Sequence, residues 1–422
     1  MTGNSRSFYG AVGLTFICLL LANVLSYLFQ LSMGRFFDPH VFSEIQSLLG
    51  LFMLVAVPAT SFSMLVTRQT SERLSLGLGT SLRGFTRSIY WALTALTLIL
   101  VAGAWMLSDP LARSLSVREP LSVTLLALCI GLSFFQLATG STLQGFQDFL
   151  GFNGQQLVAT ALKCVTLFIA LALLPTSAGV LAGVAASAGL AALFAHLRAQ
   201  KHLNRVQGEK VLQKIQQDSR FSRPAIVEAG VVLLANLGLA VLTQADVIYS
   251  HRSFSSEIAA SFAATVMIAK ALTYIPTALT IVLFPRVTQL AQSGESQREL
   301  ARLVWRSLGI TLLAVIAGVA VLSVFESLIH WIVFSRKFPR FEELLPHAAL
   351  AYFPSALTLP ILQILIALKS PRVWIVPSLA ALAFLGVLAV QPLDVHSLLY
   401  TIAGFSTLTL VGLTVELWRR LK

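Results

Sequence analysis

The sequence predicts an all-α integral membrane protein with about twelve transmembrane helices in two pseudo-symmetric six-helix lobes. The prediction depends on composition, on long apolar runs and on an internal repeat. Hydrophobic residues fill 56% of the 422 positions and charged residues only 11%, and the mean hydropathy is +0.80. A soluble domain carries about 25% charged residues. Most of this chain is therefore expected to lie in lipid.

Twelve apolar runs are long enough to cross a bilayer, since a hydrocarbon core of about 30 Å needs about 20 apolar residues. Helices are expected throughout, because open strands leave backbone groups without hydrogen bonds in lipid. The predicted spans are 9–33, 41–66, 86–107, 120–139, 152–174, 177–197, 224–245, 257–284, 303–325, 345–367, 372–391 and 396–417.

The internal repeat is a similarity in sequence between residues 20–45 and residues 233–258. Leu-Leu-Ala-Asn and Ser-Glu-Ile recur in both windows at the same separation, and seven of the 26 aligned positions are identical. Each copy covers the end of one predicted span and the start of the next. Six spans in each half give both copies the same direction, which is typical of transporters built from parallel repeats. We expect an N-terminal lobe at 1–197, a basic cytoplasmic linker at 198–223 and a C-terminal lobe at 224–422.

Lysine and arginine predict the orientation. With the N-terminus inside, 21 of them fall in cytoplasmic segments and seven in outer segments. This bias predicts that both termini are cytoplasmic. The linker is either a solvated basic segment or a short amphipathic helix on the membrane face.

Two lysines are predicted near the middle of the membrane. Lys163 falls in the fifth predicted span and Lys270 in the eighth. A charge at that depth usually faces an aqueous cavity, a partner or a substrate. Either each lysine pairs with an acid on a neighbouring helix, for which Glu228 and Asp246 are the candidates, or it binds an anionic substrate. The same two acids are the candidates for coupling to an ion.

Four further residues are candidate substrate contacts. Arg35 and Arg252, in equivalent outer loops, would add positive charge at the mouth of a pathway. Asn23 and Asn236 lie inside spans, where an amide needs a partner. They either join helices by hydrogen bonds or line a central cavity.

Several residues are expected to have structural roles. Ser43-Glu44 and Ser256-Glu257 resemble helix starts, because serine caps and an acid favours the first turn. Asp38-Pro39 similarly resembles a cap followed by proline in the first turn. Pro276 marks a possible bend, and Gly183 is expected to allow close helix packing.

No enzymatic activity, cofactor or metal is expected. The three cysteines lie inside apolar runs without metal-ligand spacing. The seven histidines are scattered, and the sequence contains no phosphate-binding Gly-Lys-Ser/Thr loop.

Several short segments of the chain form a recognisable set. They are Phe254-Ser255-Ser256-Glu257, Ala269-Lys270, Tyr274-Ile275-Pro276, Leu283-Phe284-Pro285-Arg286-Val287, Leu143-Gln144-Gly145-Phe146-Gln147, Phe334-Ser335-Arg336-Lys337-Phe338 and Lys369-Ser370-Pro371-Arg372. Together they resemble the corresponding segments of polysaccharide and O-antigen (Wzx-like) flippases of the multidrug/oligosaccharidyl-lipid/polysaccharide (MOP) exporter superfamily.

The resemblance implies a MATE-like fold in which two six-helix lobes enclose a cavity that opens to each side in turn. The implied cargo is an undecaprenyl-pyrophosphate-linked oligosaccharide, moved from the cytoplasmic to the outer leaflet of the bacterial inner membrane. The implied partners are this lipid-linked oligosaccharide and membrane lipid, with a polysaccharide polymerase and a chain-length regulator as candidates. No nucleic-acid partner is expected.

Three alternatives remain. A MATE-like multidrug/cation antiporter would need membrane-buried acids in the first or seventh span, and the first has none. A non-transporting membrane partner in envelope polysaccharide assembly is the second. A lipid II flippase is the third, although that group commonly has two extra spans.

Overall fold

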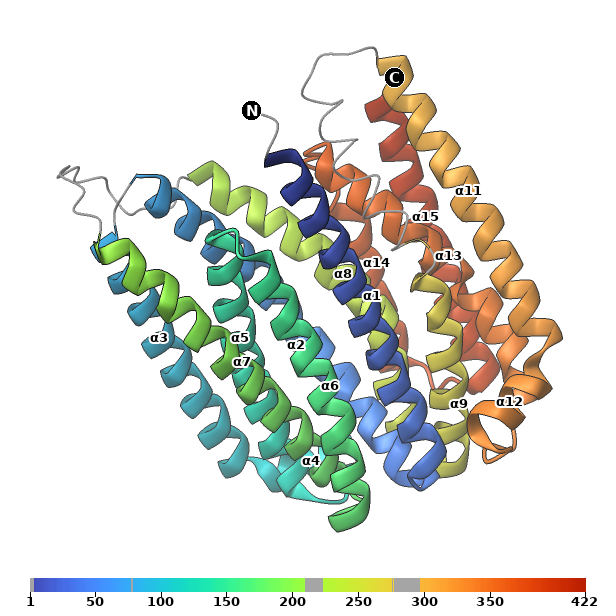
Figure 1. Ribbon diagram of the computed structural model, residues 1–422. Helices are drawn as coiled ribbons and strands as arrows, with labels where there is room; N and C mark the ends of the chain where they lie inside the picture. The colour runs from blue at the N-terminus through green and yellow to red at the C-terminus, as the bar shows by residue number, and fades with distance from the viewer. Residues whose placement is uncertain (1–3, 77–78, 209–222, 275, 277–296) are drawn as a thin grey trace. The chain divides into compact units, whose positions relative to one another are not determined.

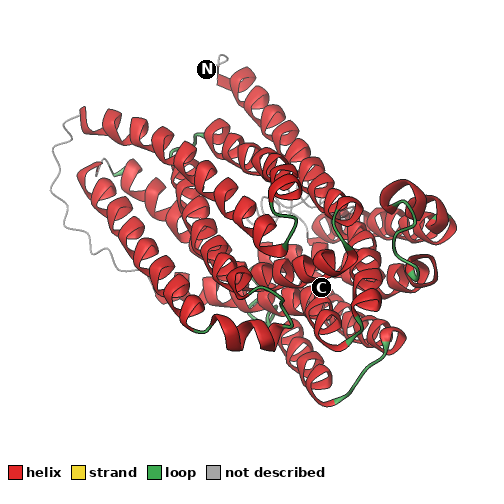
Figure 2. Ribbon diagram, turned by 90° about the horizontal axis from the view of Figure 1, so that it is seen from below, coloured by secondary structure: helices red, strands yellow, loops and turns green. Residues whose placement is uncertain are grey.

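The computed structural model describes residues 4–76, 79–208, 223–274, 276 and 297–422. The secondary structure of this part of the chain is helical, as predicted, and Figure 2 shows no strand in it. The long apolar runs form helices because a helix satisfies its own backbone hydrogen bonds.

Two compact units divide the chain. Unit 1 comprises Met1–Phe37 and Pro58–Arg220, and unit 2 comprises Asp38–Val57 and Phe221–Lys422. Helix α2 (Pro39–Ser75) contributes to both, and the division falls at its internal Pro58. The lobe boundaries drawn from the sequence stay a prediction, and linker residues 209–222 lie outside the described part.

Figure 1 follows the elements by colour from the N-terminus to the C-terminus. Beside α2, those of unit 1 are α1 (Asn4–Phe36), α3 (Gly79–Met106), α4 (Ser108–Leu115), α5 (Pro120–Gly145), α6 (Phe149–Leu173) and α7 (Ser177–Gly208). Those of unit 2 are α8 (Arg223–Ser253), α9 (Ser256–Ala269), the 3₁₀ helix η1 (Lys270–Thr273), α11 (Gln297–Val324), α12 (Glu326–Phe334), α13 (Phe341–Ala367), α14 (Ile375–Val390) and α15 (Val395–Leu421).

Each of the twelve predicted spans coincides with a helix or begins within one. Ten of the described helices are long and apolar enough to cross a membrane, and α14 is a shorter apolar helix. The short helices α4 and α12 were not predicted. Residues 277–284, at the end of the eighth predicted span, lie outside the described part.

In unit 1, small residues let the helices approach closely. Helix α5 packs against α3 and α7, and α6 packs against α1 and α7. A Cβ atom on Gly183 of α7 would lie 2.9 Å from the Cβ of Thr166 on α6. This confirms the close packing expected at Gly183. The α5–α7 contact also buries a hydrogen bond between Ser122 and Ser177, with 2.7 Å between the hydroxyl oxygens.

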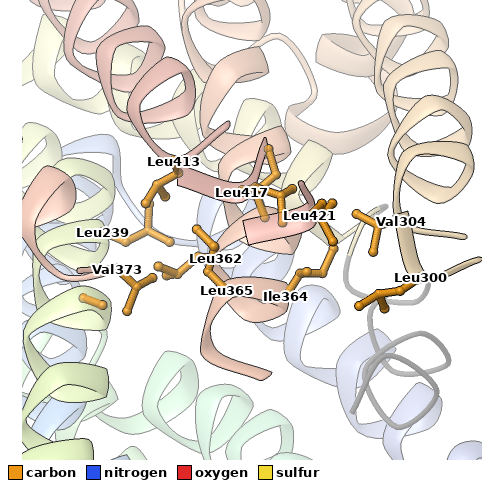
Figure 3. Close-up of a cluster of buried hydrophobic side chains, with 12 residues drawn as sticks. Leu239, Leu300, Val304, Leu362, Ile364, Leu365, Val373, Leu413, Leu417 and Leu421 are labelled. Atoms are coloured by element: carbon orange, nitrogen blue, oxygen red, sulfur yellow. The ribbon is translucent and has the colours of Figure 1, made fainter. Parts of the chain in front are cut away.

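In unit 2, α13 packs against α9, α11, α12 and α15. Figure 3 shows part of the apolar core, in which Leu362 and Leu365 of α13 lie near Leu413 and Leu417 of α15. Residues 38–57 join this unit through a contact of Phe42 with Phe338, whose ring centroids are 5.5 Å apart.

Helix α2 begins earlier than the repeated Ser-Glu pair suggests. Asp38 caps it, because its Oδ1 accepts a hydrogen bond of 2.9 Å from the N–H of His40, and Pro39 follows as expected. Ser43 therefore lies in the second turn, and its hydroxyl bonds to the carbonyl of His40. The expected helix start at Ser43 is wrong, whereas α9 does begin at Ser256.

Candidate functional site

Lys163 lies in the interior of α6, fourteen residues after its start, which is roughly 21 Å along the axis at 1.5 Å per residue. Its side chain is partly buried where α6 packs between α1 and α7. Within the described residues, no carboxylate pairs with its ammonium.

Asn23 lies on the helix that packs beside Lys163. The thiol of Cys164, next to Lys163, is 3.4 Å from the carbonyl oxygen of Leu25 on α1. This contact places Asn23 and Lys163 at similar levels on neighbouring helices. Asn23 is exposed, so its amide is open to the surroundings of unit 1. The structure thus brings these two candidates into one region.

Lys270 has an acidic partner. Its Nζ lies 3.3 Å from Oδ1 of Asp246, and the hydroxyl of Tyr352 donates a hydrogen bond to Oδ2 of the same carboxylate. The ammonium also lies 5.4 Å from the centre of the Tyr352 ring. The pairing with an acid on a neighbouring helix, one of the two alternatives for Lys270, is therefore present. Asp246, Lys270 and Tyr352 are called the unit 2 triad below.

Three elements position the triad. Asp246 lies on α8, and Tyr352 lies on α13, which packs against both α8 and α9. Lys270 begins the 3₁₀ helix η1 where the α-helix α9 ends. A 3₁₀ segment of this kind often marks a hinge. The bend expected at Pro276 stays a prediction, because residues 275 and 277–296 lie outside the described part.

The remaining candidate residues lie in surroundings that differ from those predicted from the sequence. Asp246 is not at the end of its helix, because α8 continues to Ser253. Arg35 and Arg252 lie in the last turns of α1 and α8, not in loops, and both are exposed. Asn236 donates a hydrogen bond of 2.9 Å to the carbonyl of Val232 in its own helix. Glu228 belongs to α8, but its side chain lies outside the described part.

Sequence reasoning missed Tyr352. The available signal was a single tyrosine in the proline-containing apolar span 345–367. A tyrosine hydroxyl in that setting needs a buried acceptor.

A second group that the sequence did not reveal surrounds Asp148, which caps α6. Its carboxylate accepts hydrogen bonds from the N–H of Gly151 at 2.9 Å and from Arg198 Nη2 at 2.8 Å, and pairs with His202 Nε2 at 2.9 Å. Burial alone would raise the pKa of Asp148, but the bonds from Arg198, Gly151 and His202 outweigh it and lower the pKa to about 2. This group fixes the start of the helix that carries Lys163.

Among the described residues, no group of three or more histidine, cysteine or acidic side chains is arranged to hold a metal ion.

No protein-family model matches this sequence, and no curated protein is significantly similar to it. Solved structures do match its fold. An inward-facing multidrug-resistance MATE family transporter of the MOP superfamily is 12% identical, with a TM-score of 0.74 over 95% of this chain and 94% of that one.

Two other solved structures extend the comparison. The lipid II flippase MurJ, in an inward closed conformation, is 11% identical, with a TM-score of 0.68 over 96% of this chain and 87% of that one. A MOP superfamily transporter from Pyrococcus furiosus, whose binding pocket is described as reversed in polarity, is 12% identical, with a TM-score of 0.60 over 96% of this chain and 93% of that one. This chain therefore has the fold of the MOP superfamily, the fold of MATE transporters and of MurJ.

Proposed function

We propose that this chain is a membrane transporter that flips an anionic lipid-linked oligosaccharide by alternating access. The proposed cargo is an undecaprenyl-pyrophosphate-linked polysaccharide repeat unit, moved from the cytoplasmic to the outer leaflet of a bacterial inner membrane. Both termini are then cytoplasmic. A polysaccharide polymerase and a chain-length regulator are the proposed partners in envelope assembly.

The observation that carries this proposal is Lys163. Its ammonium lies deep in an apolar helix, and no carboxylate in the described residues balances its charge. A charge in the membrane interior costs several kcal/mol unless a partner or water compensates it. A pyrophosphate that enters beside α6 would supply that compensation. Asn23 on the neighbouring helix α1 would add an amide donor.

The comparisons support a transporter but leave its cargo open. The MurJ structure belongs to a lipid II flippase and the MATE structures to multidrug-resistance transporters. The reversed pocket polarity described for the Pyrococcus furiosus transporter belongs to a chain of the same fold. The fold is thus compatible with cargoes of different charge, and the side chains must decide between them.

A MATE-like multidrug/cation antiporter is the second candidate, because the MATE fold matches with a TM-score of 0.74. Such a protein needs a buried acid that can bind a cation. Asp246 is fully buried, but Lys270 and Tyr352 already occupy its carboxylate. The side chains therefore favour an anion over a cation.

Proteoliposomes test the proposal through Lys163. A fluorescent undecaprenyl-pyrophosphate oligosaccharide is placed in one leaflet, and its rate of transfer to the other is measured. We expect Lys163→Gln to slow transfer at least tenfold and Lys163→Arg to restore most of it, since arginine keeps the charge. Lys201→Gln is the matched control, because Lys201 is exposed at the end of α7 and should leave transfer unchanged.

Unchanged transfer in Lys163→Gln would contradict the role of Lys163. A non-transporting assembly partner predicts no transfer by the wild-type chain at all.

A further inference from the structure

We propose that the exposed face of α11 binds an anionic phospholipid of the surrounding bilayer through Arg298, Arg302 and Arg306. These three residues and Trp305 are called the α11 arginine stripe below. The lipid phosphate lies between Arg302 and Arg306, and the acyl chains follow the apolar residues farther along the helix. The inference does not depend on which molecule the chain transports.

The three arginines form one line along α11. They are spaced four residues apart, and residues at this spacing are neighbours on a helix surface. At 1.5 Å per residue the line is roughly 12 Å long. All three side chains are exposed, whereas Leu300 and Val304, on the opposite face of the helix, are buried. The buried face fixes the rotation of α11 and turns the arginines away from the apolar core of unit 2.

The apolar part of α11 places Arg306 at the edge of the hydrocarbon layer. The rest of the helix, residues 307–324, contains no charged side chain. At 1.5 Å per residue this segment spans roughly 27 Å, close to the hydrocarbon core of about 30 Å. Arg306 therefore lies at the level of the lipid phosphates, and Arg302 lies roughly 6 Å farther into the headgroup layer. Trp305 is 40% exposed at the same level, where tryptophan is enriched in membrane proteins.

Apolar side chains continue the stripe into the hydrocarbon layer. Leu313 follows Arg306 by two helical turns, so it lies on the same face of α11. Leu313, Ile310 and Ile316 are all exposed. An acyl chain can therefore run along the face that carries the guanidinium groups. Membrane lipid of any kind contacts this apolar face, and the arginines select the headgroup.

The stripe carries more positive charge than nearby acids compensate. Glu299 is the acid in the first turn of α11, against three arginines. Within the described residues, no ion pair joins Glu299 or any other carboxylate to the stripe. Like charges four residues apart weaken a helix. A phosphate between Arg302 and Arg306 removes that repulsion, and planar guanidinium groups donate paired hydrogen bonds to phosphate oxygens.

The end of α15 brings further positive charge to the same level. Leu421 of α15 belongs to the same apolar cluster as Val304, and Figure 3 shows the two side by side. The last turn of α15 carries Arg419, and Lys422 lies 3.8 Å from the centre of the exposed Trp418 ring. Two neighbouring helices thus present tryptophan and basic side chains at one level. Basic clusters of this kind favour anionic over zwitterionic lipid.

Quenching of Trp305 by spin-labelled lipid tests the proposal. The full chain is reconstituted in phosphatidylcholine bilayers that contain either phosphatidylglycerol or phosphatidylcholine spin-labelled near the headgroup. The signal of Trp305 is the difference between each protein and the same protein with Trp305→Phe. Its dependence on the fraction of labelled lipid gives the affinity of the stripe for phosphatidylglycerol relative to phosphatidylcholine. We expect the wild type to prefer phosphatidylglycerol by about fivefold or more.

Two double variants locate the preference. Arg302→Gln with Arg306→Gln should lower it to less than about twofold, because both phosphate contacts are lost. Arg68→Gln with Lys201→Gln is the matched control. It removes the same charge from two exposed positions on α2 and α7 of unit 1, and it should keep the preference of the wild type.

Competition against the wild type provides a second test, which needs no change to the arginines. Unlabelled phosphatidylglycerol should relieve the quenching by its labelled form, and inorganic phosphate should not, because it lacks the acyl chains that hold the lipid on α11. Relief by inorganic phosphate would show a simple anion site and overturn the proposal. Undecaprenyl pyrophosphate that relieved the quenching at a tenfold lower fraction than phosphatidylglycerol would also overturn it, and would assign the stripe to a polyprenyl lipid.

Two further outcomes contradict the proposal. Equal quenching by both labelled lipids in the wild type would show that the stripe does not select its headgroup. A preference that survives in Arg302→Gln with Arg306→Gln, or that falls equally in the control pair, would show that the net charge of the chain attracts the lipid and the stripe does not.

Discussion

Loss of Lys270 should destabilise unit 2 strongly, because it leaves the charge of Asp246 buried without its ionic partner. Replacing Lys270 by glutamine leaves a fully buried carboxylate with Tyr352 as its remaining partner. Breaking one partner of a buried pair typically costs about 3–5 kcal/mol. In a unit of roughly 220 residues, 1 kcal/mol shifts Tm by about 2–4 °C, so we expect a fall of about 6–20 °C.

A double-mutant cycle of Lys270→Gln and Asp246→Asn isolates the pair. The double variant removes both charges and leaves neither buried and unpaired, so it should lose less than the sum of the single variants by about 2–3 kcal/mol. Thermal unfolding of the purified chain, followed by intrinsic fluorescence without ligand, provides the measurement.

Glu257→Gln is the control, since Glu257 is an exposed acid in the first turn of α9 and should change stability by less than about 0.5 kcal/mol. The coupling of this pair would be refuted if both single variants unfolded at the Tm of the wild type. It would also be refuted if the loss of stability in the double variant equalled the sum of the losses in the two single variants.

Two further predictions concern unit 1. Asp148→Ala should destabilise unit 1 at pH 7. Because folding lowers the pKa of Asp148 from 3.8 to about 2, this carboxylate contributes about 2 kcal/mol to stability above about pH 4, and the contribution disappears as the pH falls toward 2. The stabilities of the variant and the wild type, measured by unfolding between pH 7 and pH 3, should therefore converge as the pH falls. Gly183→Ala should cost about 1–3 kcal/mol because its Cβ would lie 2.9 Å from Thr166. Gly103→Ala, in open space on α3, should be neutral or stabilising by up to about 1 kcal/mol, and equal Tm values for the two alanine variants would contradict the packing argument.

Composition and run length were sufficient to predict the helices, because lipid leaves the backbone few alternatives to a helix. Their ends were harder to place. Helix α2 begins at Pro39, because Asp38 supplies a cap, so the repeated Ser43 lies in the second turn. The short helices α4 and α12 were missed because neither is long enough to register as a span.

The candidate site was predictable as a set of residue types but not as a set of contacts. The depth of Lys163 and Lys270 follows from counting residues along a span. Which of them has a partner depends on the level at which α8, α9 and α13 meet, and no local pattern encodes that level. The sequence named Asp246 as a possible partner of Lys270, but Tyr352 is 106 positions from Asp246, and no local pattern links the two.

Asn236 illustrates the same limit. It was expected to bond between helices or to line a cavity, yet its amide donates to Val232 one turn earlier. An intrahelical bond and an interhelical one look alike in sequence. The equivalent Asn23 is exposed and remains a candidate contact.

The charge of the transported molecule tests the central claim most directly. Proteoliposomes that contain the wild-type chain are given, in parallel, a labelled undecaprenyl-pyrophosphate oligosaccharide and a labelled cationic drug, and transfer of each across the bilayer is timed. The predicted result is that the wild-type chain transfers the pyrophosphate lipid, that Lys163→Gln slows this transfer at least tenfold, and that the drug does not affect it. Transfer of the cation with none of the pyrophosphate lipid would contradict it and would favour a cation antiporter.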